Sequence, residues 1–289
     1  MTSRALVLGG GGLVGVAYES GLLRGFADAG LDLAAADLVL GTSAGSIVGS
    51  LLRLGEQPEA ALGLLAAGGP TLVPPAGMSA FFEDLVAVSA EASSPEDARR
   101  RLGRVAVSAP TASEEEYVAL FSAVEERPWP PGFACTAVDV ETGQPKVWDA
   151  ESGISLDRAV ASSCAVPALF PPVTIGGRRW MDGGMRTALN AGLASGHDLV
   201  LAISCFALEL PPGMSDPMVE GLNAQIREEI DGLRAAGAEV GLVVPGPEML
   251  EASGWGLEAM NEDRVAAGWE AGLAQSAREL ELVGRLWAA

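Results

Sequence analysis

The chain has 289 residues and 49% hydrophobic content, which is enough for one large α/β domain with a substantial core. Its net charge of −20 excludes nucleic acid as a partner and disfavours docking on anionic lipid. Three cysteines without paired spacing are typical of a reducing compartment, and we find neither a signal-peptide core nor an apolar run of membrane-spanning length. We therefore expect a cytoplasmic protein with at most transient membrane contact. The oligomeric state is left open.

The first predicted strand, residues 5–8, is followed by four glycines at 9–12 and a helix over 16–29. Glycine-rich turns between a strand and a helix present bare N–H groups to anions. Two anions fit here. One is the pyrophosphate of a dinucleotide, because Gly10, Gly12 and Gly15 match G-x-G-x-x-G. The other is the oxyanion of an acyl-transfer intermediate, bound by the N–H groups of Gly10, Gly11 and Gly12.

The acidic residues favour the oxyanion. A dinucleotide site needs a carboxylate at the C-terminal end of the second strand. Asp32 and Asp37 come before that strand, which we predict at 38–40. A nicotinamide-dependent oxidoreductase stays as an alternative, which cofactor-dependent thermal stabilisation would reveal.

The second strand leads into Gly41-Thr42-Ser43-Ala44-Gly45, a G-x-S-x-G pattern, and then into an apolar helical stretch. This order of strand, turn and helix is that of a nucleophile elbow, which holds a serine hydroxyl clear of the backbone. Gly41 and Gly45 fit positions that are too close for a Cβ. Ser43 is therefore the candidate nucleophile, and the N–H of Ala44 a candidate oxyanion donor.

Residues 56–130 are mostly helical in composition and are broken by prolines. One apolar stripe in this segment suits core packing better than an acyl groove or a lid; it comprises Met78, Phe81, Phe82, Leu85 and Val86. Pro74-Pro75 lies just before the stripe, where it would allow a hinge.

The remainder alternates strands and helices, which predicts one α/β domain over residues 1–289, built as a three-layer α/β/α sandwich with a mainly parallel sheet. Residues 56–130 form its helical insertion. Trp255, between two glycines, is a possible rim residue of the site. The predicted elements are hairpins at 133–140 with 145–148 and within 173–180, strands at 199–204 and 240–244, and helices at 156–163, 218–236 and 264–287.

Two residues compete to be the base that accepts the serine proton. His197 is the only histidine, but it directly precedes the strand at 199–204, whereas active sites of parallel sheets lie beyond the C-terminal strand ends. We interpret His197 as a surface or structural residue. Asp182 follows the predicted hairpin at 173–180 and lies in Met181-Asp182-Gly183-Gly184, although Asp-Gly alone is an ordinary turn pair.

Four segments in order resemble the patatin-like phospholipase family over most of the chain. Gly10-Gly11-Gly12-Leu13-Val14-Gly15 resembles its oxyanion loop and Gly41-Thr42-Ser43-Ala44-Gly45 its elbow. The block from Ala161 to Val173 is similar to its Ala-Ser-rich segment ending in Phe-Pro-Pro, and Asp182-Gly183-Gly184 to its Asp-Gly-Gly motif.

The resemblance implies a Ser43–Asp182 dyad that cleaves lipid or other fatty acyl esters through an acyl-enzyme, and we expect no cofactor. One His and three dispersed Cys provide no ligand cluster, so we expect no metal site. Val14 stands where the family commonly has Arg or Lys. We therefore expect turnover of small esters with little phospholipase activity. The alternative is a catalytically weak or inactive relative that acts as a lipid-binding or regulatory protein.

Overall fold

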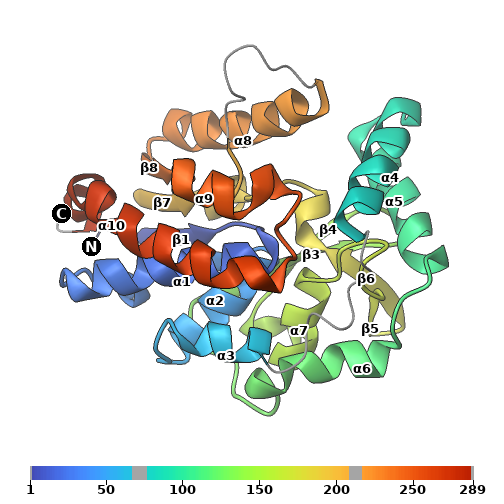
Figure 1. Cartoon of the computed structure of the whole chain (residues 1–289), viewed down its shortest axis with the longest axis horizontal. Helices are drawn as coiled ribbons and strands as arrows, with labels where there is room; N and C mark the ends of the chain where they lie inside the picture. The colour runs from blue at the N-terminus through green and yellow to red at the C-terminus, as the bar shows by residue number, and fades with distance from the viewer. Residues whose placement is uncertain (1, 67–76, 208–216, 288–289) are drawn as a thin grey trace.

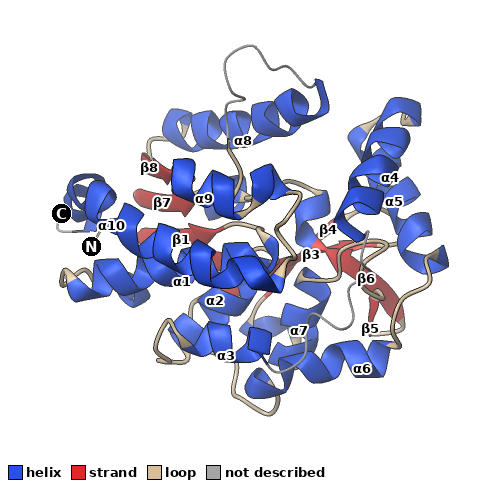
Figure 2. Ribbon diagram, in the orientation of Figure 1, coloured by secondary structure: helices blue, strands red, loops and turns tan. Residues whose placement is uncertain are grey.

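A single mixed β-sheet lies at the centre of the molecule (Figures 1 and 2). The computed structural model describes residues 2–66, 77–207 and 217–287. Within these residues the sheet has eight strands in the order β5-β6-β3-β2-β1-β7-β8, with β4 paired to β3. The strands are β1 Arg4–Leu8, β2 Leu38–Gly41, β3 Phe133–Asp139, β4 Pro145–Trp148, β5 Val173–Ile175, β6 Arg178–Asp182, β7 Leu199–Ile203 and β8 Glu239–Val243.

The sheet is parallel from β3 through β2, β1 and β7 to β8, whereas β4, β5 and β6 are joined by antiparallel pairings. Helices cover both of its faces, as Figure 2 shows. The helices are α1 Gly12–Asp28, α2 Ala44–Arg53, α3 Ala60–Ala66, α4 Gly77–Glu91, α5 Pro95–Ser108, α6 Glu114–Val118, α7 Leu156–Ser163, α8 Pro217–Ala235, α9 Pro247–Ala252 and α10 Val265–Trp287. This is the α/β/α sandwich that the sequence predicts.

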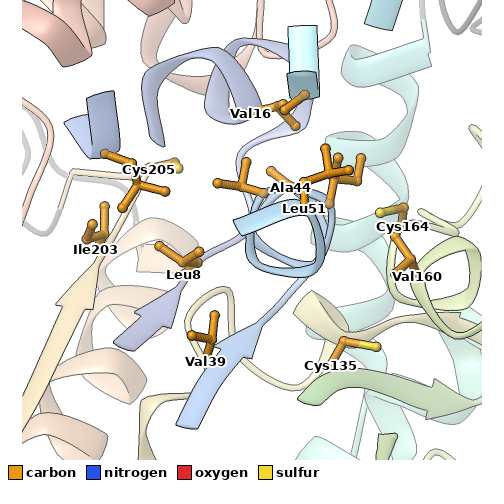
Figure 3. Packing of buried hydrophobic residues seen from close by; sticks show 14 of the residues in the cluster. Leu8, Val16, Val39, Ala44, Leu51, Cys135, Val160, Cys164, Ile203 and Cys205 are labelled. Atoms are coloured by element: carbon orange, nitrogen blue, oxygen red, sulfur yellow. The ribbon is translucent and has the colours of Figure 1, made fainter. Parts of the chain in front are cut away.

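Alternation along the buried strands separates two apolar layers. Leu6 and Leu8 of β1 belong to the larger core, together with apolar residues of α1, α2 and α10. Ala5 and Val7 point the other way, into a second cluster that includes Ile230 of α8. Figure 3 shows the larger core, with Leu8 of β1 and side chains of α2 among its members. The central strands are thus buried on both faces, as a parallel sheet requires.

The edge of β3 brings two distant parts of the chain together. Cys135 pairs with Gly41 of β2 on one side and with β4 on the other. Ala137 also pairs with β4 on this second edge, and it pairs with Asp182 of β6 on the edge that β2 occupies. Strands β2 and β6 therefore share one edge of β3. They run in opposite directions, and their C-terminal ends meet at Thr136.

Most predicted elements agree with the structure within one or two residues. The largest difference is at α1, which begins at Gly12 rather than near residue 16, so that the glycine loop leads straight into a helix. Between α2 and β3 the described residues are mainly helical, in α3 to α6. Pro74-Pro75, the suggested hinge, lies outside the described residues.

Candidate active site

Ser43 occupies the sharp turn between β2 and α2. Its backbone has φ 51° and ψ −117°, which residues with a side chain rarely adopt. The turn also brings backbone very close on both sides, since a Cβ on Gly41 would overlap the Gly45 carbonyl and a Cβ on Gly45 the Leu8 carbonyl. The two glycines of the predicted elbow are therefore needed for steric reasons.

Side chains from α2 and from the end of α7 hold this turn. The Ser43 N–H donates to Ser163 Oγ at 3.0 Å. The Ser43 carbonyl accepts from Ser46 Oγ at 2.7 Å and from Cys164 Sγ at 3.2 Å. Fixing both peptide groups of a strained residue offsets the cost of its conformation, about 1–3 kcal/mol. Ser163 and Cys164 belong to the Ala-Ser-rich block, which thereby acquires a structural role.

Asp182 ends β6 and is only 2% exposed. Its Oδ1 accepts the Gly184 N–H at 2.6 Å, whereas its Oδ2 is buried without a hydrogen-bond partner. Burial raises the pKa of this carboxyl to about 7, against the opposing effects of the Ser43 hydroxyl and the Gly184 amide. The Ser43 hydroxyl is thus close enough to act on the carboxyl, although it makes no hydrogen bond of normal geometry with it. An acceptor with a pKa near neutrality is suited to general-base work.

A buried polar cluster beneath the two residues sets their spacing. Thr42 Oγ1 and Thr136 Oγ1 are 2.9 Å apart, and Asn190 Nδ2 donates to Thr42 Oγ1 at 3.1 Å and to the Gly183 carbonyl at 3.1 Å. The cluster ties the end of β2, the middle of β3 and the turn after β6 together. A Cβ on Gly183 would overlap the Thr136 side chain, so the turn after Asp182 also needs a glycine.

The glycine loop differs from the prediction at one residue. The Gly10 N–H donates to the Ala188 carbonyl at 2.8 Å and is not free to bind an oxyanion. Among the described residues, the N–H groups of Gly11, Gly12 and Ala44 have no protein acceptor. The last two lie in the first turns of α1 and α2, where the helix dipoles favour negative charge.

Packing against α10 accounts for the apolar residue in this loop. Val14 is fully buried, its N–H donates to the Ala259 carbonyl at 3.0 Å, and its side chain faces Gly268 of α10. A charged side chain has no room there. Gly15 packs on the Cys205 side chain, where a Cβ would be 3.2 Å from the sulfur. The three cysteines of the chain are free and buried.

An apolar cavity of about 80 Å³ opens beside Ser43. At about 10–15 Å³ for each water-sized group, it has room for roughly five to eight such groups. Tyr117 stacks on Phe170 with ring centres 4.8 Å apart and meets Phe121 edge-on at 5.4 Å. The lining residues are Gly12, Leu13, Val16, Ser43, Ala44, Ile47, Tyr117, Leu120, Phe121, Cys164, Val166, Phe170 and Met260.

Three features that the sequence analysis weighed for the site, namely His197, the apolar stripe of α4 and Trp255, do not line the cavity. His197 precedes β7 at the opposite end of the sheet from Ser43 and bonds the Ala194 carbonyl through Nδ1. Phe81 is buried in the core, and neither it nor the rest of the α4 stripe lines the cavity. Trp255 is 49% exposed in a loop that is continuous with Met260 of the cavity wall.

Glu19 is a buried acid that the sequence analysis did not single out. It is fully buried in α1, and both carboxyl oxygens are without a hydrogen-bond partner. Burial raises its pKa well above the usual range, and the adjoining Cys205 thiol and Gly9 amide, neither of which has hydrogen-bond geometry to the carboxyl, offset this only in part. Its position in the sequence, on a helix face otherwise rich in apolar residues, is the one available signal.

These features place the chain among α/β proteins whose candidate site is a serine on a strand-to-helix turn. Its sequence matches the patatin-like phospholipase family over residues 6–195, and the chain belongs to that family. Membership supports lipid acyl hydrolysis as the class of reaction. No described helix has the length and apolarity needed to cross a membrane, and the described residues hold no group of three side chains suited to a metal ion.

Among solved structures, the chain is similar to VipD from Legionella pneumophila and to the type III effector ExoU. VipD is 13% identical, with a TM-score of 0.47, and the match covers 98% of this chain and 67% of VipD. ExoU is 14% identical, with a TM-score of 0.42, and the match covers 98% of this chain and 53% of ExoU. The chain thus spans about two thirds of one and about half of the other. A comparison with curated proteins finds no match.

Proposed function

We propose that this protein hydrolyses fatty acyl esters of lipids, with Ser43 as nucleophile and Asp182 as general base. The observation that carries the proposal is one arrangement: a serine in a strained turn beside an apolar cavity, and a buried carboxyl whose pKa burial raises to about 7 and the serine hydroxyl lowers. An acyl chain fits an apolar cavity, and the ester carbonyl would then lie next to the serine.

The reaction has two halves. Ser43 Oγ attacks the ester carbonyl carbon while its proton passes to Asp182 Oδ2, and the carbonyl oxygen becomes an oxyanion bound by the N–H groups of Gly11, Gly12 and Ala44. Collapse of this intermediate breaks the ester C–O bond, and the leaving alcohol takes the proton from Asp182.

The acyl-enzyme is then hydrolysed. Water gives a proton to Asp182 as it attacks the acyl carbon, and the same N–H groups bind the second oxyanion that forms. Release of the fatty acid returns the proton to Ser43 Oγ. Each oxyanion donor is typically worth about 2.7–4 kcal/mol of barrier.

Labelling with a fluorophosphonate tests the proposal. Intact mass and peptide mapping of the wild type should show one adduct on Ser43, and the Ser43→Ala variant should show none. Ser50→Ala is the matched control for the same helix, because the Ser50 hydroxyl donates to the Ile47 carbonyl at 2.8 Å and does not touch the Ser43 turn, and it should still be labelled at Ser43. A folded wild type that forms no adduct and turns over no ester would favour the alternative of an inactive lipid-binding relative.

A further inference from the structure

Two large apolar side chains stand out of the loop formed by residues 253–260. Leu257 is 57% exposed and Trp255 is 49% exposed. They are separated by one residue, Gly256, and no charged side chain lies between them. Resting on the proposed function, we propose that this loop docks on an electrically neutral lipid surface through Trp255 and Leu257, and so delivers lipid esters to the cavity.

The backbone of the loop is built to turn the indole outward. Trp255 has φ 57°, an outlier for a bulky residue, and it lies between Gly254 at φ 54° and Gly256 at φ 98°. The loop is nevertheless well bonded, because the Ser253 carbonyl accepts from Gly256 N at 2.9 Å and from Glu258 N at 2.8 Å. A compact, hydrogen-bonded loop that holds a tryptophan in a strained outward position presents a preformed surface.

The same loop forms part of the cavity wall. Met260 lines the cavity, and the preceding Ala259 carbonyl accepts the Val14 N–H at 3.0 Å, which anchors the loop to the start of α1. Two residues separate Leu257 from Met260, so the three steps between their Cα atoms span at most about 11 Å. A surface in contact with Leu257 is therefore also next to the cavity.

Charge selects the kind of lipid surface. Residues 251–264 contain one base, Arg264, against four acids, which are Glu251, Glu258, Glu262 and Asp263. Anionic lipid attracts basic segments and would repel this loop, as it would repel the chain as a whole with its net charge of −20. A tryptophan next to a leucine is the composition that partitions into the interfacial region of a bilayer. The occupant that fits is therefore a zwitterionic surface such as phosphatidylcholine.

Vesicle binding by the double variant Trp255→Ser/Leu257→Ser tests the proposal. The double variant and its parent both carry Ser43→Ala, so that lipid is not consumed, and each is sedimented with phosphatidylcholine vesicles. We expect the double variant to partition at least tenfold more weakly. The matched control is Val107→Ser/Leu193→Ser, which removes two exposed apolar side chains of other surfaces and should bind as the parent does.

Activity assays on proteins that keep Ser43 separate this inference from the proposed function. The double variant should lose at least tenfold more activity on phosphatidylcholine vesicles than on a short, fully dissolved ester. If the wild type hydrolyses the dissolved ester but both proteins bind vesicles equally, the docking loop is wrong and the proposed function stands. If the wild type hydrolyses neither substrate, the proposed function fails, and the sedimentation result decides on docking by itself.

Two further outcomes would overturn the proposal. Tighter binding to vesicles with added phosphatidylglycerol would refute the preference for neutral lipid. A wild-type dimer that becomes monomeric in the double variant would show that a second copy of the chain covers these side chains. As a converse test, Glu251→Lys/Glu262→Lys should gain binding to phosphatidylglycerol vesicles, because two exposed acids are replaced by bases.

Discussion

Replacing Asp182 by Asn should abolish turnover and at the same time stabilise the fold in a pH-dependent way. The carboxyl has a pKa of about 7 in the folded protein against an ordinary value of 3.8. This difference corresponds to about 4 kcal/mol of folding free energy. Asparagine has no charge to bury, and its Oδ1 can still accept the Gly184 N–H.

The sign follows from the two ionisation states. Below pH 3.8 the carboxyl is protonated in both the folded and the unfolded chain, so its burial has its smallest cost. Between 3.8 and about 7 the unfolded chain is ionised and the folded one is not, and the stability of the wild type falls by about 1.4 kcal/mol per pH unit relative to Asp182→Asn. Above pH 7 the difference levels off.

Urea unfolding of both proteins from pH 4.5 to pH 8 measures this difference directly. Contributions from all other groups cancel in the comparison. Asp231→Asn, at a side chain that is 75% exposed, is the control and should give no pH-dependent difference. A stability difference between Asp182→Asn and the wild type that stays constant across this range would refute the assignment of a buried, proton-accepting Asp182.

Three other predictions follow from the site. First, kcat/KM for a dissolved ester should rise with pH to half its maximum near pH 7, because only ionised Asp182 accepts the serine proton; a flat profile from pH 5 to pH 8 would contradict this. Second, Glu19→Met should raise the free energy of unfolding by about 1–3 kcal/mol, measured in urea, because it removes a buried carboxyl without partners; a loss of stability would show that Glu19 is bonded in solution. Third, Phe121→Ala enlarges the cavity and should raise the ratio of long-chain to short-chain ester turnover at least tenfold, measured on a nitrophenyl ester series; an unchanged ratio would place the acyl chain elsewhere.

The sequence predicts the elements that depend on local pattern. The order of strand, elbow and helix around Ser43 is visible because apolar runs and glycine positions lie within about 20 residues. The position of His197 before a strand was enough to set it aside, and the structure places it at the far end of the sheet. The fold class follows from the alternation of strands and helices along the chain, and the family from the resemblance of four motifs that keep their order between residues 10 and 184.

Long-range features are not encoded in such patterns. The pairing of β2 with β3 joins residues 94 positions apart, and the pairing of β6 with the same edge joins residues 41–45 positions apart. The engagement of the Gly10 N–H depends on Ala188, which no motif connects to the glycine loop. The sequence favours core packing for the α4 stripe, which agrees with the burial of Phe81, but it does not single out Tyr117 and Phe121, which line the cavity, because helical periodicity marks an apolar face without indicating what that face contacts.

The shared edge of β3 has a consequence for how the protein folds. The candidate site exists only once β3 has accepted β2 on one half of its edge and β6 on the other, and a slip of β6 by one residue would turn Asp182 to the opposite face of the sheet. Helices form early because their contacts are local, whereas the pairing of both β2 and β6 with β3 requires closure of long loops. Recovery of activity during refolding should therefore lag behind recovery of helical signal. Shortening or lengthening the segments that connect β3 to β2 and to β6 should alter that delay. The distance between Ser43 and Asp182 in the folded protein should stay unchanged.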